Sequence, residues 1–296
     1  MLGLLLLDKP QDITSFGAVA RIKRLAGEKR VGHTGTLDPM ATGVLPILIG
    51  RATVLSQYLI EADKSYTATV KLGIATDSCD ITGEVISERE VNVTEQDIDD
   101  TLQKFKGKQM QVPPMFSAIK QNGVRMYELA RKGETVEIPA REIEVFSLDK
   151  TSGVNENNEF QIDCNVSKGT YIRSLCRDIG ESLGTGATLT ALRRTKTAGF
   201  DISRCVKLDD LTPENIADYI LPCDLVVDYM PSVTISHKQA IRFCNGGELS
   251  LERVKYENFK DNEIYRVYFE DKFLGLGRAD TDKNLLKIEC LVDRQV

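Results

Sequence analysis

The chain has 296 residues, of which 42% are hydrophobic and 28% are charged. This composition excludes a disordered or fibrous chain and fits a globular protein with one large domain and an appendage, or with two domains. The net charge of −6 argues weakly against a nucleic-acid partner, but residues 61–100 carry three basic and eleven acidic side chains, whereas residues 103–132 carry seven and one. The basic stretch matters more for phosphate contact than the total charge does.

Cysteine, histidine and hydropathy patterns indicate whether the protein binds metal, is secreted or enters a membrane. Seven cysteines without a C-x-x-C pair, together with only two histidines, provide no zinc-site spacing, so we expect reduced and mostly buried thiols and no metal. The apolar run Leu4–Leu7 is stopped by Asp8 and Lys9, and it is too short for a signal sequence. No apolar run of membrane-spanning length follows. We therefore expect a cytoplasmic protein without membrane association.

The first 31 residues predict a buried strand at Leu4–Leu7, a loop through Lys9 and a helix capped by Thr14 or Ser15. The helix and its exit carry Arg21, Lys23, Arg24, Lys29 and Arg30. Such a cluster is ordinarily a solvated face. Because this cluster lies just before a glycine-rich loop, contact with RNA phosphates is about as well supported as a solvated face.

That loop, residues 32–45, contains three glycines, three threonines, one proline and a single carboxylate, Asp38. Glycine and proline punctuate regular structure, and the apolar run Val44–Ile49 that follows predicts a buried strand. We expect a tight loop at the rim of a core element that presents Asp38. An ordinary turn, in which the aspartate bonds its own backbone, fits the composition equally well.

The stretch from His33 to Leu45 resembles the catalytic motif of the bacterial tRNA pseudouridine-55 synthases, the TruB family. Further matches follow in the right order over most of the first 200 residues: Asp8-Lys9-Pro10, Lys64-Ser65-Tyr66, residues 76–84, Lys168-Gly-Thr-Tyr-Ile-Arg-Ser174 and residues 189–195. The resemblance implies that Asp38 is the catalytic residue and that Tyr66 is the active-site tyrosine. It also implies that Arg173 pairs with Asp38.

Four further residues are candidates for substrate binding. The resemblance places Tyr171 against the target nucleoside, Leu192 in the uridine pocket and Lys9 under the active-site floor. His33, five residues before Asp38, is placed to fill the space that a displaced base leaves. The residues alone also fit a half-buried strand tyrosine at Tyr66, a surface arginine at position 173, a core leucine at 192 and structural roles for Lys9 and His33.

Between these motifs the patterns predict further elements. They are a helix at 52–60 with Val54, Leu55, Tyr58 and Leu59 inward, a strand from Tyr66, a polar turn at 76–84, a helix from Thr94 to Lys106, an extended proline-containing loop at 112–120, a short basic helix at 123–133, strands at 143–150 and 160–166, and a helix ending at Leu183. By resemblance, a segment of about 105–142 is an insertion that contacts RNA. A plain solvent-facing helix is the alternative at 123–133.

The resemblance implies an α/β (α+β) pseudouridine synthase fold, with a largely antiparallel central sheet flanked by helices. We expect a catalytic domain at 1–231 and a small β-rich, PUA-like RNA-binding domain at 232–296. Strands are predicted there at 233–235, 264–269, 273–277 and 285–290. A β-rich extension of another role is the alternative.

The chemistry that the resemblance implies is an isomerisation. Converting uridine to pseudouridine breaks the C1′–N1 bond and joins C1′ to C5, with no redox change, so no cofactor is expected. One carboxylate suffices, acting at the sugar or at C6 of the base, and Tyr66 is suited to stack on the base or handle a proton. A cation is unfavourable at a helix N-terminus, so Arg173 there points to an anionic neighbour that it would keep ionised.

Four functions are compatible with these features. The first is isomerisation of uridine 55 in the TΨC stem-loop of tRNA without an obligate protein partner. The others are a guide-dependent RNA pseudouridylase, a non-catalytic tRNA-binding or folding factor, and an aspartate-nucleophile hydrolase of small molecules. The basic stretch at 103–132 argues against the hydrolase, and the proline-rich and basic segment at 113–133 argues, by resemblance, against the guide-dependent enzyme.

Overall fold

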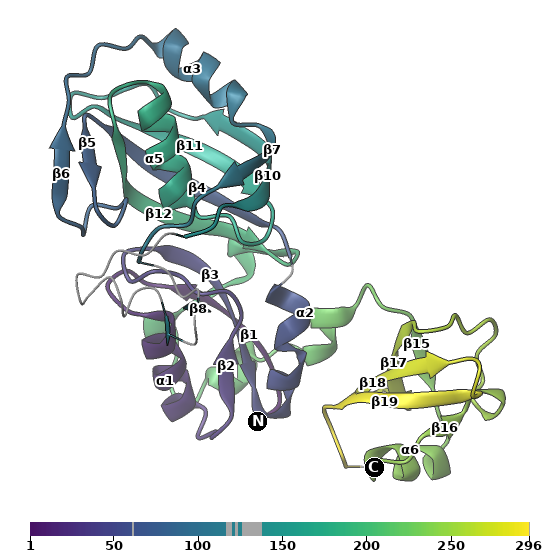
Figure 1. Ribbon diagram of the computed structural model, residues 1–296. Coiled ribbons are helices and arrows are strands. Elements are labelled where there is room, and N and C mark those ends of the chain that lie inside the picture. The colour runs from purple at the N-terminus through teal and green to yellow at the C-terminus, as the bar shows by residue number, and fades with distance from the viewer. Residues whose placement is uncertain (61, 117–119, 122–123, 126–137, 296) are drawn as a thin grey trace.

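The strands form two main sheets, one large and central and one small and C-terminal (Figure 1). The computed structural model describes residues 1–60, 62–116, 120–121, 124–125 and 138–295. Within this part, the central sheet has ten strands: β1 (Gly3–Lys9), β2 (Val31–His33), β3 (Thr42–Ile49), β4 (Lys64–Leu72), β7 (Gly107–Gln111), β10 (Arg141–Lys150), β11 (Glu159–Val166), β12 (Ala187–Thr197), β13 (Phe200–Asp201) and β14 (Val206–Lys207).

The main path of the central sheet runs in the order β14-β1-β3-β12-β4-β11-β10-β7. Its neighbours are antiparallel except at β1–β14 and β3–β12, which confirms the expected largely antiparallel sheet. The parallel contact between β3 and β12 joins the N-terminal strands to the remainder, at the pairs Arg193–Thr42 and Arg194–Gly43. Strands from distant parts of the sequence therefore meet in the middle of the sheet.

Helices and short hairpins surround this sheet. The helices are α1 (Ser15–Leu25), α2 (Ser56–Ile60), α3 (Glu95–Lys104) and α5 (Ile172–Ser182), with 3₁₀ turns η1 (Gly50–Leu55), η2 (Ile202–Arg204), η3 (Leu208–Asp210), η4 (Ile216–Tyr219) and η5 (Cys223–Val227). The hairpins are β5 (Ile74–Thr76) with β6 (Val85–Glu88), and β8 (Lys120–Gln121) with β9 (Val124–Arg125). None of the helices in the described ranges is long and apolar enough to span a membrane.

The leucine run of β1 explains how the sheet is covered on both faces. Side chains alternate between the faces of a strand. Leu5 and Leu7 accordingly enter one hydrophobic cluster with α1 and α5, while Leu4 and Leu6 enter a second. The second cluster also contains Phe273 and Leu276 from the C-terminal sheet and the nearby Val292, so that sheet is packed against the central one.

The C-terminal sheet has the strand order β15-β17-β18-β19-β16. Its elements are β15 (Ser232–Thr234), α6 (His237–Cys244), β16 (Leu249–Ser250), η6 (Leu251–Arg253), β17 (Ile264–Phe269), β18 (Lys272–Asp280) and β19 (Leu285–Leu291). The four predicted strands are confirmed. Helix α6 was not predicted, although Ser236 and Gln239 form a capping box at its start.

Several local expectations are confirmed and some are wrong. Thr14 caps α1, and Thr94 caps α3 in a capping box with Asp97. Residues 50–55 form a 3₁₀ turn before α2 rather than one helix, and Val54 is exposed instead of inward. Residues 124–125 belong to strand β9 and not to the basic helix predicted at 123–133. The rest of that helix lies outside the described residues, as does much of the predicted RNA-contacting insertion.

Substitution of Gly43 tests the close contact between β3 and β12 in the middle of the central sheet. Its φ is +105°, and an added Cβ would lie 2.2 Å from the carbonyl oxygen of Arg194 on β12. We expect Gly43→Ala to lower the free energy of unfolding by about 3 kcal/mol or more, because backbone strain and a backbone clash add. Urea denaturation measures this loss. Gly27→Ala is the control, since its φ is also positive but nothing lies within 4 Å of the new atom, and it should cost about 1 kcal/mol. Equal losses would contradict the close junction.

Candidate active site

The loop that carries Asp38 connects β2 to β3, and hydrogen bonds to its backbone hold it in place. The buried hydroxyl of Ser15 accepts a hydrogen bond from the Leu37 N–H at 2.8 Å and donates to the Leu37 carbonyl at 2.9 Å. The Pro39 carbonyl accepts from the Asp12 N–H at 2.9 Å. The Ala41 N–H donates to the Asp38 carbonyl at 3.0 Å, which closes a turn. These backbone contacts leave the Asp38 side chain projecting from the loop.

Lys9 lies beneath this loop. It is fully buried, and its Nζ donates to the carbonyls of Pro10 and Ile13 at 2.7 Å and of Pro39 at 3.3 Å. Burial lowers the pKa of Lys9 to about 8, and the negative charges of Asp38 and Asp12 partly oppose that shift. Lys9 is therefore bonded to the carbonyl of Pro39, the residue after Asp38, rather than to the Asp38 carboxylate.

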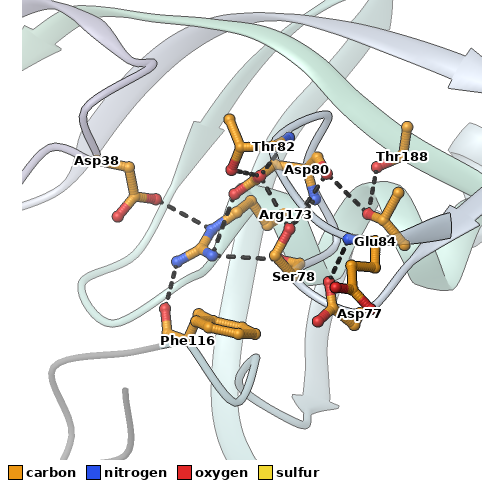
Figure 2. A network of polar contacts seen from close by, with 10 residues as sticks. Asp38, Asp77, Ser78, Asp80, Thr82, Glu84, Phe116, Arg173 and Thr188 are labelled. Carbon is orange, nitrogen blue, oxygen red and sulfur yellow. Dashed lines mark hydrogen bonds and ion pairs between the residues drawn. The ribbon is translucent and has the colours of Figure 1, made fainter. Parts of the chain in front are cut away.

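Arg173 brings distant segments together around Asp38 (Figure 2). It stands in the first turn of α5 and is only 5% exposed. Its Nε lies 3.0 Å from Asp38 Oδ2, and its Nη1 lies 3.3 Å from Asp80 Oδ2. The same guanidinium donates to the carbonyls of Ser78 at 3.2 Å and Phe116 at 2.7 Å. The expected Asp38–Arg173 pair is present, and a second carboxylate joins it.

Sequence reasoning treated Asp80 only as part of a polar turn. Asp80 is buried, and its Oδ1 accepts from Ser78 Oγ at 2.9 Å and from the Thr82 N–H at 3.0 Å. Its Oδ2 is left to face Arg173. The dense run of Asp, Ser and Thr at 76–84 was the available signal, since such side chains close a turn around a buried carboxylate.

Tyr66 and Arg194 lie beside each other, which was also not predicted from the sequence. They face each other across β4 and β12, and both are buried. Arg194 donates to the carbonyl of Val44 at 2.8 Å and of Gly35 at 3.0 Å, so it also ties β12 to β3 and to the Asp38 loop. Burial raises the pKa of Tyr66, while the charge and hydrogen bond of Arg194 oppose the rise and the charge of Asp38 adds to it.

The remaining predicted residues occupy different surroundings. Tyr171 precedes α5, and the buried Gln111 amide bonds both its N–H at 2.9 Å and its carbonyl at 3.1 Å. Leu192 is half-buried on β12 opposite Ala68 and packs against the main hydrophobic cluster. His33 is half-buried, and its Nδ1 has no hydrogen-bond partner within the part of the chain described. Burial and Arg194 lower the pKa of His33.

The carboxylate of Asp38 is both accessible and electrostatically constrained. Its side chain is 37% exposed, so it is reachable from solvent. The protein atoms around it nevertheless raise its pKa by desolvation, and Asp80 adds to the rise. Arg173 opposes the rise most strongly and Lys9 opposes it less. A group in this setting can act as a nucleophile or a base at neutral pH, provided that the cations keep it ionised.

Family models cover most of the chain. The model for the N-terminal domain of TruB family pseudouridylate synthases matches residues 23–172, and the model for the C-terminal domain of tRNA pseudouridylate synthase B matches residues 173–228. The chain belongs to the TruB family of pseudouridylate synthases. As a member of this family, it is a pseudouridine synthase, and its sequence motifs around Asp38 and Arg173 fall inside the matched ranges.

Individual relatives agree with this assignment. The tRNA pseudouridine synthase B of Clostridium tetani is 43% identical over 279 residues, which cover 94% of this chain and 96% of the relative. That of Clostridium novyi is 43% identical over 99% of this chain and all of the relative. Among solved structures, the crystal structure of a Cbf5-Nop10-Gar1 complex contains a chain that matches with a TM-score of 0.73 and 26% identity. That match covers 99% of this chain and 85% of the other. The pseudouridine synthase fold is thereby confirmed.

Asp80→Asn tests the second carboxylate of the Arg173 network. We expect kcat for pseudouridine formation to fall about 10- to 100-fold and the free energy of unfolding to fall by about 3 kcal/mol, because a buried ion pair loses one charge. Asp77→Asn is the matched control. Asp77 lies in the same turn but is exposed and accepts from the Glu84 N–H, a bond that an amide oxygen can keep (Figure 2). Equal activity in the two variants would contradict a role for Asp80.

The pH dependence of kcat/KM tests the setting of Asp38. A raised pKa keeps the carboxyl protonated to a higher pH, so activity should be lost as the pH falls through a midpoint above the ordinary value of 3.8. Arg173→Met should move this midpoint to higher pH, because Arg173 contributes the largest opposing effect on the pKa of Asp38. Arg173→Lys, which keeps the charge, should shift it less. A midpoint that stays fixed or falls in Arg173→Met would refute this account.

Proposed function

We propose that the chain isomerises uridine 55 in the TΨC stem-loop of tRNA, with Asp38 as the reacting carboxylate. The observation that carries the proposal is the ion pair at 3.0 Å between Asp38 and the buried Arg173, with the Asp38 side chain still 37% open. The curated relatives supply the substrate class, since they are tRNA pseudouridine synthases B at 43% identity.

The proposed roles follow from the positions of the side chains. Arg173 holds Asp38 ionised and oriented, so that the carboxylate can act at C1′, at C6 or on a sugar proton of a uridine that has left the base stack. Tyr66 is buried beside Arg194 and is proposed to contact the base and to handle its C5 proton. Tyr171 and Leu192 are proposed to line the uridine site, Lys9 to support its floor and His33 to occupy the space behind the displaced base.

The proposal extends to the organisation of the protein. Residues 1–231 would catalyse and the small C-terminal sheet of 232–296 would bind RNA, with the reaction in the cytoplasm and with no obligate protein partner. The solved relative stands in a complex named Cbf5-Nop10-Gar1, which keeps a partner-dependent RNA pseudouridylase as the second candidate. The higher identity to the tRNA enzymes, 43% against 26%, favours the first.

Asp38→Asn provides the test. Purified wild-type protein, incubated alone with an unmodified TΨC stem-loop transcript, should form pseudouridine, as measured by base analysis of the RNA. Asp38→Asn should reduce the rate by at least about 10³-fold, because the neutral amide keeps the shape but removes the reacting charge.

Asp12→Asn is the matched control. Asp12 is exposed in the neighbouring loop and has a positive φ that asparagine adopts readily, so this variant should keep its activity. Absence of product with the isolated wild type would favour the partner-dependent candidate. Tight RNA binding without product, unchanged in Asp38→Asn, would favour a non-catalytic binding factor.

A further inference from the structure

Among the large hydrophobic side chains that the structure describes, Phe16 has the highest exposed fraction. It lies in the first turn of α1 and is 77% exposed, whereas Val19 and Ile22 on the same helix are 5% and 0% exposed. The helix therefore uses a different face to pack against the core. A single exposed apolar side chain is ordinary on its own, so the neighbours of the ring decide whether it serves a ligand.

The location of Phe16 relative to Asp38 is set by its neighbour. Ser15 bonds both the N–H and the carbonyl of Leu37, the residue directly before Asp38. Phe16 thus stands at the end of α1 that adjoins the reactive loop. The start of the helix cannot shift away from this loop without breaking both bonds of a buried serine.

The outer face of α1 continues from this ring into positive charge. Lys23 and Arg24 are exposed and lie seven and eight residues after Phe16, or about 10–12 Å further along the helix. Among the described carboxylates none pairs with either of them, while Arg21 pairs with Asp209 at 2.9 Å. Residues 15–25 contain no acidic side chain. An exposed aromatic ring followed by free cations is the pattern that binds single-stranded nucleic acid.

We propose that the outer face of α1 binds the unpaired RNA strand next to the target uridine. The ring of Phe16 stacks on one neighbouring unpaired base, and Lys23 and Arg24 contact the phosphates beyond it. This inference rests on the proposed function, because a uridine drawn towards Asp38 leaves its neighbours without a stacking partner. An acidic peptide would match the cations, but it offers no planar partner for the ring.

The first experiment compares Phe16→Ala, Phe16→Tyr and Phe146→Ala. Phe146 is a partly exposed phenylalanine on β10, at the opposite end of the central sheet from the N-terminal strands. With an unmodified stem-loop transcript, Phe16→Ala should raise KM, and the dissociation constant measured by fluorescence anisotropy, about 10-fold. Its kcat should stay within about 2-fold and its unfolding midpoint should not change. Phe16→Tyr should restore wild-type values, and Phe146→Ala should match wild type.

The second experiment locates the stacked base. Transcripts with an abasic site at each loop position except the target are compared between wild type and Phe16→Ala. At one position next to the target, the abasic site should weaken wild-type binding and abolish the difference between the two proteins. Lys23→Ala with Arg24→Ala should lower the slope of log affinity against log salt concentration by up to about two.

Two results would overturn the proposal: a dissociation constant of Phe16→Ala equal to that of wild type, or a Phe16 effect that persists with every abasic transcript. The proposed function fails separately, if the wild type forms no pseudouridine. In that case the anisotropy measurements still decide whether α1 binds RNA.

Discussion

The buried guanidinium of Arg173 is the interaction on which the site depends. Its acceptors are the carboxylates of Asp38 and Asp80 and the carbonyls of Ser78 and Phe116, which lie 57 to 135 residues before it in the chain. A charge at 5% exposure is costly unless every donor is satisfied. The requirement to satisfy it therefore fixes the Asp38 loop, the turn between β5 and β6 and the start of α5 against one another.

The charges around this cation explain how an accessible aspartate can stay reactive. Two carboxylates face one guanidinium, and Asp80 together with burial raises the pKa of Asp38. Lys9 adds positive charge near Asp38 without forming an ion pair with it in the described part of the chain, because backbone carbonyls hold its ammonium group. The carboxylate can thus be held ionised by one direct partner while its other side stays open to a substrate.

Sequence alone predicted the local features and left the long-range ones open. The Leu4–Leu7 strand, the caps at Thr14 and Thr94 and the loop around Asp38 follow from local patterns, because neighbouring residues determine them. The Asp38–Arg173 pair came from family resemblance, since no local signal links residues 135 apart. Asp80 and Arg194 were missed because charged residues are usually exposed, and burial depends on strand pairing that composition does not reveal. Val54 was misjudged because residues 50–55 form a 3₁₀ turn, whose three-residue period differs from that of the expected α-helix. Helix α6 was missed because its eight residues repeat an apolar pattern only about twice.

We infer that the target uridine reacts at Asp38 while Arg173 holds that carboxylate. A crystal structure of the Asp38→Asn protein with an unmodified TΨC stem-loop tests it most directly. We expect an unstacked uridine with its sugar or base edge about 3–3.5 Å from the side chain of residue 38 and with Arg173 still in contact with Asp80. A uridine that stays stacked in the RNA loop, or that lies against other side chains away from residue 38, would show that Asp38 is not the reacting group.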